Sequence, residues 1–391
     1  MLNTAFSPWP SYTKEEADAV SAVLLSNKVN YWTGTEARDF EVEFAAFAGA
    51  RHAVAVANGT VALDLALKGL GIGIGDEVIV TARTFLASAS CIVNVGAKPV
   101  FADVDRDTQN ITVETVYPLI NKKTRAIIAV HLAGWPCDMD SLNQLAQEHG
   151  LYVIEDCAQA HGATYKGRPV GGLGDVAAWS FCQDKIMTTG GEGGMVTTNN
   201  QELWSRMWSF KDHGKSWSAV YEREHPPGFR WLHESIGTNW RMTEMQAVIG
   251  RIQLRRMADW RRLRINNCDL IWDMARKRSG LRAPVVPVGI GHAAYKCYLF
   301  IEPESLRAGW SRDRIMASIM ARGVPCFSGS CSEVYLEKCF TNAGLAPEAR
   351  LPVARELGET SLMFLVHPTL TCQEIEKTVS VINEVMDEAS R

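Results

Sequence analysis

The chain has 391 residues, of which 47% are hydrophobic and 21% are charged, a balance typical of a globular protein and not of a disordered one. Forty Lys and Arg residues against 44 Asp and Glu residues leave a formal net charge of −4, which excludes a surface built mainly to neutralise nucleic acid. At about 150 residues per domain, the length predicts two or three domains, or one large domain with an appendage.

The opening sequence has no basic segment followed by an apolar stretch, and no run approaches the roughly 18 apolar residues of a membrane-spanning helix. We therefore expect a cytoplasmic protein with neither a membrane nor a nucleic acid as its partner. Ten cysteines are present without a CxxC pair. Cys91, Cys137, Cys157 and Cys182 lie among apolar or small residues, so we predict buried free thiols and no metal site.

Short β-branched runs alternate with helical patterns between residues 50 and 200, as in βαβ units around a parallel sheet. We predict seven strands, at 52–56, 77–81, 99–103, 125–131, 151–155, 177–181 and 195–198. Helices are predicted at 61–69, 85–94, 139–148 and 201–215. The predicted fold class is α/β, with a large domain whose mostly parallel seven-stranded sheet is flanked by helices.

After residue 215 the alternation of strands and helices is replaced by a turn-rich stretch and a long helix. Residues 216–234 form a turn-rich stretch, and we interpret its Trp217 and Trp231 either as platforms for a sugar or as part of a dimer interface. A basic amphipathic helix follows at 243–269, which suits a link between domains better than nucleic-acid binding.

The last part of the chain has fewer strands and more helices, with elements expected at 298–302, 312–322 and 372–389. This pattern predicts a smaller α/β C-terminal domain. We predict a first domain of residues 1–250, which holds an N-terminal arm and the large domain. Residues 251–391 would hold the linking helix and the small domain.

A single lysine stands between a strand and a glycine-rich turn in SFCQDKIMTTGGEGGMVTT. This residue, Lys185, sits where a lysine is most often simply exposed, so the segment alone assigns no function. Asp156 ends the apolar strand LYVIED, and ligands of parallel α/β sheets gather beyond the carboxyl ends of the strands. An acid at that place could keep a pyridine nitrogen protonated beside a lysine that forms a Schiff base.

A phosphate site is also readable in AVAVANGTVALDLAL, which runs from strand through turn to helix. Gly59 and Thr60 stand at the start of that helix, where backbone amides and a hydroxyl suit a phosphate dianion. An NGT sequence before a helix is more often only an N-cap. Phe85, just after the strand EVIVT, could stack on a planar ring or fill the core.

Six motifs then occur in the order found in one family: ANGTVAL, TFLASAS with GAKPVFADVD, HLAGWPCDMD, EDCAQAHGA, SFCQDK with GGEGGM, and GTNWRMTEMQA. The chain closely resembles the DegT/StrS-like nucleotide-sugar aminotransferases. These are pyridoxal-phosphate enzymes of fold type I, the aspartate aminotransferase-like architecture. The resemblance extends over nearly the whole chain, from NYWTGTEARDFEVEFAAFAGA to LPVARELGETSLMFLVHPTL.

The resemblance implies pyridoxal 5'-phosphate as the cofactor and assigns roles to several residues of its ring site. The Schiff-base lysine of the family falls on Lys185, and the carboxylate that faces the pyridine nitrogen falls on Asp156. Gln159 matches the glutamine that approaches the ring hydroxyl, and Phe85 matches the aromatic residue stacked on the ring.

The family's phosphate-binding positions fall on Gly59, Thr60 and Ser180. Asn239, in GTNWRM, corresponds to an asparagine that reaches the phosphate from the neighbouring subunit. The resemblance therefore implies a homodimer with shared active sites.

The activity implied is transamination of a nucleotide-linked keto-deoxysugar by an amino acid donor, giving an amino sugar for a polysaccharide or glycoconjugate. Glutamate is the expected donor and glutamine the alternative. A lysine at position 185 favours transamination, because related dehydratases carry histidine there. A non-catalytic or regulatory protein with the cofactor fold and a lyase acting on a related sugar are the other hypotheses.

Other polar residues receive less specific interpretations. We interpret His131 and His161, which lie beside strand ends, as structural residues. Arg230, Arg241 and Lys296 could contact a pyrophosphate or form ion pairs within the protein.

Overall fold

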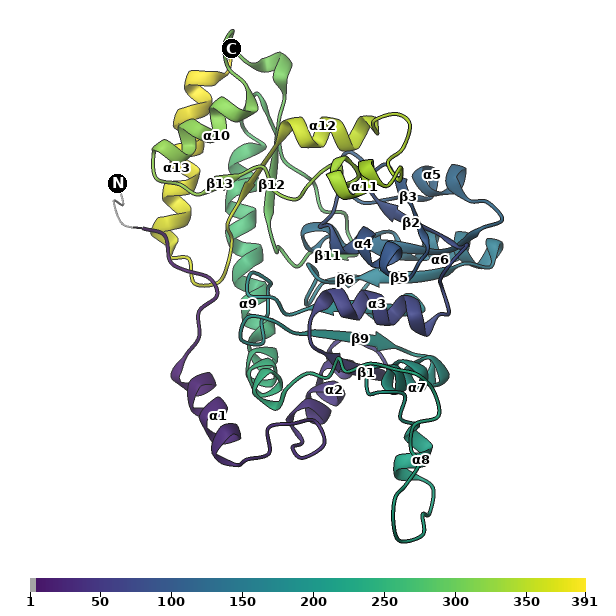
Figure 1. Cartoon of the computed structure of the whole chain (residues 1–391). Coiled ribbons are helices and arrows are strands. Elements are labelled where there is room, and N and C mark those ends of the chain that lie inside the picture. Colours follow the sequence, from purple (N-terminus) through teal and green to yellow (C-terminus); the bar gives the residue numbers. More distant parts are fainter. Residues whose placement is uncertain (1–4) are drawn as a thin grey trace.

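Residues 5–391 are described by a computed structural model, in which a large sheet and a small sheet are joined by one long helix (Figure 1). The large sheet has the strand order β1-β9-β8-β5-β4-β2-β3. Its strands are β1 (His52–Val56), β2 (Glu77–Thr81), β3 (Lys98–Ala102), β4 (Thr124–Val130), β5 (Tyr152–Asp156), β8 (Val176–Ser180) and β9 (Gly194–Thr198). Each predicted strand is present within one residue of its predicted bounds.

The sheet is parallel except at β9, which runs antiparallel to both of its neighbours. The mostly parallel sheet that we predicted is therefore confirmed. The helices that flank it are α2 (Glu36–Phe47), α3 (Gly59–Gly69), α4 (Ala87–Asn94), α6 (Met139–His149) and α7 (Gln201–Phe210).

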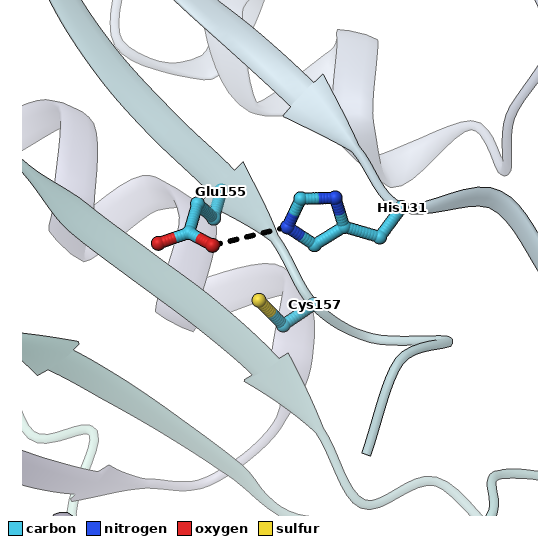
Figure 2. Close-up of side chains that lie close together, drawn as sticks. All are labelled: His131, Glu155 and Cys157. Atoms are coloured by element: carbon cyan, nitrogen blue, oxygen red, sulfur yellow. Dashed lines mark hydrogen bonds and ion pairs between the residues drawn. The ribbon is translucent and has the colours of Figure 1, made fainter. Parts of the chain in front are cut away.

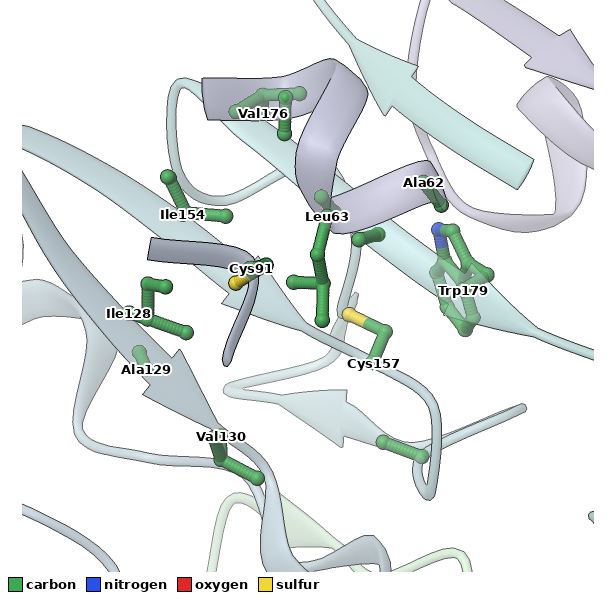
Figure 3. Packing of buried hydrophobic residues seen from close by; sticks show 14 of the residues in the cluster. Ala62, Leu63, Cys91, Ile128, Ala129, Val130, Ile154, Cys157, Val176 and Trp179 are labelled. Atoms are coloured by element: carbon green, nitrogen blue, oxygen red, sulfur yellow. The ribbon is translucent and has the colours of Figure 1, made fainter. Parts of the chain in front are cut away.

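Helices and strands share a dry core in this large domain. Figure 3 shows Leu63 of α3 and Cys91 of α4 beside one side chain from each of three central strands. These side chains are Ile128 of β4, Ile154 of β5 and Trp179 of β8. Burial at about 25 cal/mol per Å² of apolar surface makes this core the main stabilising contribution. The strands are therefore held rigidly, and the residues at their ends are placed with precision.

The small sheet is antiparallel, with the order β10-β12-β14-β13. Its strands are β10 (Leu281–Arg282), β12 (Cys297–Ile301), β13 (Cys326–Phe327) and β14 (Ser361–Phe364), and it packs with α10 (Arg312–Ala321) and α13 (Cys372–Ala389). A separate hydrophobic cluster forms its core. This arrangement agrees with the predicted smaller α/β C-terminal part.

The remaining elements are short or lie at the periphery. They are α1 (Lys14–Leu25), α5 (Val113–Val116), η1 (Tyr117–Leu119), η2 (Leu132–Gly134), β6 (Thr164–Tyr165), β7 (Arg168–Pro169), α8 (Trp217–Tyr221), β11 (Ile290–Gly291), η3 (Pro303–Ser305), η4 (Val334–Leu336), α11 (Lys338–Asn342) and α12 (Pro352–Thr360). Three of them form a third, small sheet in the order β11-β6-β7.

The long helix α9 (Glu244–Ala275) joins the two cores, as predicted from its amphipathic pattern. Ala247 and Met257 belong to the large core, whereas Ile271 and Trp272 belong to the small one. The domain boundary predicted between residues 250 and 251 lies within this helix and stays a prediction.

Several arginines of α9 form ion pairs within the chain. Arg251 contacts Glu36 and Asp39 of α2, at 2.6 and 2.9 Å. It also contacts Glu43 of the same helix at 2.7 Å. These pairs anchor the N-terminal helix α2 along α9, and a further ion pair of α9 does the same for α1, so that both helices lie beside α9 in Figure 1.

Four predicted helices differ from their predicted bounds by two residues or more. The helix predicted at 61–69 begins at Gly59, and the one predicted at 243–269 extends to Ala275. The helix predicted at 85–94 begins at Ala87, which leaves Phe85 in the preceding loop. The helix predicted at 201–215 ends at Phe210, because Lys211 turns inward to pair with buried Glu41 at 3.0 Å and Gly214 takes a left-handed φ of 81°.

The two loop tryptophans that we grouped do not lie together. Trp217 packs against Trp204 and Trp208, with ring centres 5.0 Å away in each case. Trp231 is 81% exposed and contacts Phe229 instead. Trp217 is therefore a packing residue of the large domain.

All ten cysteines are free thiols. Cys91, Cys137 and Cys157 are buried as predicted, but Cys182 is partly exposed because it lies in the loop after β8. Among residues 5–391, no helix is both long and apolar enough to cross a membrane.

Candidate active site

Lys185 lies in the loop between β8 and β9, at the carboxyl end of the central strands. Its side chain is 14% exposed, and its Nζ lies 3.7 Å from Asp184 Oδ1 and 5.3 Å from the centre of the Tyr295 ring. The indole N–H of Trp9 donates to the Lys185 carbonyl oxygen at 2.8 Å. The amine is thus sheltered from solvent, and Asp184 lies beside it without a close ion pair.

Asp156 is the last residue of β5, which runs parallel to β8, so it lies at the same sheet edge as the Lys185 loop. Its carboxylate is buried and accepts hydrogen bonds from Ser88 Oγ at 2.7 Å and from the Ala158 N–H at 3.1 Å. Because Ser88 gives its only proton to Asp156, the Thr84 hydroxyl at 2.7 Å must donate to Ser88. This relay fixes the plane of the carboxylate.

Gln159 is oriented by an unusual piece of backbone. Its Oε1 accepts the N–H of Ala133 at 2.9 Å, and Ala133 adopts a left-handed φ of 56° that costs an alanine about 1 kcal/mol or more. The Ala133 carbonyl accepts the N–H of Tyr295 at 3.0 Å. With its carbonyl engaged in this way, Gln159 has its amide NH₂ left to donate to a ligand.

Three of the predicted phosphate residues lie together. Gly59 and Thr60 open α3, and the Asn58 side chain caps that helix by accepting the Val61 N–H at 3.0 Å. A Cβ atom at Gly59 would stand only 2.5 Å from the Cβ of Ser180, so a side chain there is excluded. The helix N-terminus therefore abuts the Ser180 hydroxyl, and backbone N–H groups and helix dipole favour an anion at this place.

Phe85 follows Thr84 at the same edge and is 66% exposed. The alternative that Phe85 fills the core is therefore wrong, and its stacking role stays a prediction. Asn239 is also exposed, in a segment that runs beside the end of β1, where the Ala57 N–H donates to the Trp240 carbonyl at 2.9 Å. Its predicted reach into a neighbouring subunit stays a prediction.

The structure thus brings seven of the eight predicted residues to one edge of the sheet, through direct contacts or adjacent strand ends. The residues that the sequence did not point out are Trp9, Thr84, Ser88, Ala133 and Tyr295. A signal existed only for Thr84 and Ser88, which are hydroxyl residues flanking Phe85 in TFLASAS.

A second polar cluster lies under the site, where His131, Glu155 and Cys157 approach one another (Figure 2). His131 Nδ1 accepts the Cys137 N–H at 3.0 Å, so the proton is on Nε2, which donates to Glu155 at 3.0 Å. Glu155 also accepts three backbone N–H groups, from Gly171, Leu173 and Gly174. Because the donors and acceptors of this pair are already used, the cluster is structural, as we interpreted His131, and does not suit a metal.

Glu155 is expected to contribute acid-sensitive stability. Burial by itself raises the pKa of Glu155, but the hydrogen bonds from His131 and from Gly171 and Gly174 outweigh it and hold the pKa below its usual value. This contribution is therefore complete above the pKa of the unfolded chain, about 4.3, and is lost as the pH falls through the lower pKa of the folded protein.

We expect Glu155→Gln to lower the free energy of unfolding at pH 7 by about 3 kcal/mol, measured by urea denaturation. Below about pH 4 the difference from the wild type should shrink, since a protonated glutamate resembles glutamine. An equal difference at both pH values would contradict this assignment.

His161 is also buried, between the rings of Trp179 and Phe181. Burial lowers its pKa to about 3, with Lys185 and Arg264 adding to the effect, so it is neutral at pH 7. Of the residues considered for pyrophosphate binding, Arg241 instead donates to buried Asp212 at 2.5 Å. Arg241 therefore forms an ion pair within the protein, the second of the two roles that the sequence allowed.

A lysine in a loop and an acid at the carboxyl edge of this sheet, beside a helix N-terminus, match the site expected for a pyridoxal-phosphate enzyme of fold type I. Residues 10–383 match the DegT/DnrJ/EryC1/StrS aminotransferase family, and the chain belongs to that family. The family, the enzyme class and the pyridoxal-phosphate cofactor that we predicted are thereby confirmed.

Known proteins resemble the chain over nearly its whole length. The X-ray structure of an aminotransferase from Psychrobacter cryohalolentis is 63% identical, with a TM-score of 0.97 over 98% of this chain and 99% of that one. DesV of S. venezuelae, solved in complex with a ketimine intermediate, is 34% identical, with a TM-score of 0.85 over 96% and 95% of the two chains. The dTDP-3-amino-3,4,6-trideoxy-alpha-D-glucose transaminase of Streptomyces venezuelae is 36% identical over 95% of this chain and 92% of its own length.

Proposed function

We propose that this aminotransferase moves nitrogen from an amino acid, glutamate in the first instance, to a nucleotide-linked keto-deoxysugar. The product would be an NDP-amino sugar for a polysaccharide or glycoconjugate. The observation that carries the proposal is the placement of Lys185, Asp156 and the α3 N-terminus at one sheet edge. The similarity to a transaminase named for a dTDP-linked amino sugar supports the substrate class.

The residues of this edge fit pyridoxal phosphate. The N–H groups of Gly59 and Thr60 and the hydroxyl of Ser180 would hold its phosphate, and Phe85 would cover one face of its ring. Bound there, the cofactor supplies an electron sink for the carbanion that forms when the donor's α-carbon loses its proton.

Each polar residue then has a defined task. The Asp156 carboxylate, oriented by Ser88, would hold a proton on the ring nitrogen and so keep the ring an acceptor of electrons. The Gln159 amide would donate to the ring hydroxyl. The Lys185 amine would act as the base that takes the α-proton of the donor and delivers a proton to the aldehyde carbon of the cofactor.

The test is a reaction of the holoenzyme with nitrogen-labelled glutamate and a panel of keto-sugar nucleotides, followed by mass spectrometry. We expect the label in the amino group of one sugar nucleotide. Release of an elimination product without labelled amine would favour the lyase instead, and label transfer from glutamine alone would correct the donor.

We also propose that the active chain is a homodimer with shared sites. The segment that includes α8 extends away from the large domain (Figure 1), and it carries three large apolar residues that are more than three-quarters exposed, Phe229, Trp231 and Ile236. Apolar side chains gathered on a protruding segment favour contact with another protein surface. Asn239 lies just beyond them, where such a contact could carry it to a second site.

Mixed dimers test this sharing. Lys185→Ala and Asn239→Asp should each be nearly inactive, the latter because a carboxylate would repel the phosphate. Coexpression should restore about a quarter of wild-type activity, since half of randomly paired dimers would hold one intact site. If the coexpressed mixture is no more active than either variant alone, each active site takes its residues from a single subunit.

A further inference from the structure

Among residues 5–391, one cation near the catalytic lysine has no acidic partner. Arg264 of α9 is only 2% exposed, and its Nε and Nη2 atoms are buried without a hydrogen-bond acceptor. Burial lowers its pKa to about 9, and the interaction with Tyr295 partly offsets that effect, so the guanidinium is still charged at pH 7. Buried charges are ordinarily paired, because leaving one unpaired costs several kcal/mol.

Arg264 and Lys185 share two aromatic neighbours. Trp9 donates to the Lys185 carbonyl, and the Arg264 Cζ lies 5.0 Å from the centre of the Trp9 ring. Tyr295 lies 5.3 Å from Lys185 Nζ and also interacts electrostatically with Arg264. The guanidinium therefore borders the site that holds the catalytic amine.

The other titratable groups around Arg264 do not balance its charge. Burial lowers the pKa of His161 to about 3 and that of His367 to about 4, so both are neutral at pH 7. Asp184 already accepts the Tyr295 hydroxyl at 2.5 Å and lies 3.7 Å from Lys185 Nζ. This wall of the site thus carries an excess of positive charge that suits an anionic ligand.

We infer that Arg264 binds the α-carboxylate of the amino acid donor, an inference that rests on the proposed function. Nε and Nη2 form one edge of the guanidinium, the geometry that receives both oxygens of a carboxylate in two parallel hydrogen bonds. A donor whose carboxylate meets this edge would bring its amine toward Lys185. Trp9, on the N-terminal arm, would be the side chain that yields to admit it.

The test uses Arg264→Met, which keeps the volume but removes the charge, in the holoenzyme. The control is Arg261→Gln, a half-buried arginine one helical turn earlier that also lacks an acidic partner but lines a different cavity of about 340 Å³. Conversion of the bound cofactor is followed with glutamate and with 4-aminobutyrate, which has no carboxylate on its amine-bearing carbon. Calorimetry with succinate measures dicarboxylate binding without turnover, and thermal unfolding reports the fold.

We expect Arg264→Met to raise the KM for glutamate about 100-fold, to abolish succinate binding and to leave the 4-aminobutyrate reaction unchanged. Its melting temperature should equal or exceed that of the wild type, since an unpaired buried charge is removed. The inference would be overturned by an unchanged KM for glutamate or by an equal loss of rate with glutamate and with 4-aminobutyrate. A melting temperature below that of the wild type would overturn it as well. If the wild type fails to react with glutamate, the proposed function is wrong, and loss or retention of succinate binding still decides the role of Arg264.

Discussion

Replacing Lys185 by alanine is expected to lower steady-state transamination by about 1000-fold or more, while the protein stays folded. The amine supplies both the covalent attachment of the cofactor and the base that moves the α-proton, so one substitution removes two functions. The side chain is sheltered beside Tyr295 and forms no short ion pair, so its loss should cost little stability. The measurement is the rate of keto-acid formation from glutamate in the presence of the sugar acceptor.

The matched control is Lys166→Ala. Lys166 is exposed and pairs with Asp140 at 2.7 Å on the surface, where such pairs contribute at most about 1 kcal/mol. Its loss should leave the rate unchanged. Appreciable turnover by the Lys185→Ala variant would show that this lysine is not the catalytic residue.

The second large effect is expected for Asp156→Asn, which should slow α-proton abstraction by about 100-fold or more. An amide does not raise the pKa of the pyridine nitrogen as a carboxylate does. Each unit by which that pKa falls corresponds to about 1.4 kcal/mol less stabilisation of the protonated ring. Asparagine can still accept the Ala158 N–H through its oxygen, and its NH₂ group can donate to the Ser88 hydroxyl, which then donates to Thr84, so the local structure should persist. Single-turnover absorbance after mixing the holoenzyme with glutamate measures this step.

Asp175→Asn provides the comparison for this substitution. Asp175 lies at the opposite end of the same pair of strands, where its carboxylate accepts the Val153 N–H at 2.7 Å. Its variant should retain the wild-type rate. A similar slowing in both variants would mean that the sheet, and not the acid at 156, had been disturbed.

Much of the large domain was predictable because its strands are buried on both faces. β4 contains the apolar run AIIAV and β5 begins with the apolar residues YVI, and the acid that ends β5 marked the carboxyl edge of the sheet. Lys185 and Asp156 could therefore be placed together before their contacts were known. The resemblance of the ordered motifs to one family then predicted cofactor-binding roles for Gln159 and Ser180, which their residue types alone do not indicate.

The rest of the site depends on contacts between distant parts of the chain. Trp9 reaches Lys185 across 176 positions, and Arg264 of α9 shares the neighbours Trp9 and Tyr295 with Lys185. Periodicity describes α9 as amphipathic but does not distinguish its ion-paired arginines from one left without a partner. The left-handed backbone of Ala133 has no signature in its residue type, since alanine rarely adopts it.

The central claim is that the amine of Lys185 attaches to the carbonyl carbon of pyridoxal phosphate. The direct measurement is borohydride reduction of the holoenzyme, which makes that bond permanent, followed by digestion and mass mapping of the modified peptide. We predict a single modified residue, Lys185, and none in a sample treated with glutamate before reduction. Modification of another lysine, or none at all in protein that binds the cofactor, would contradict the account.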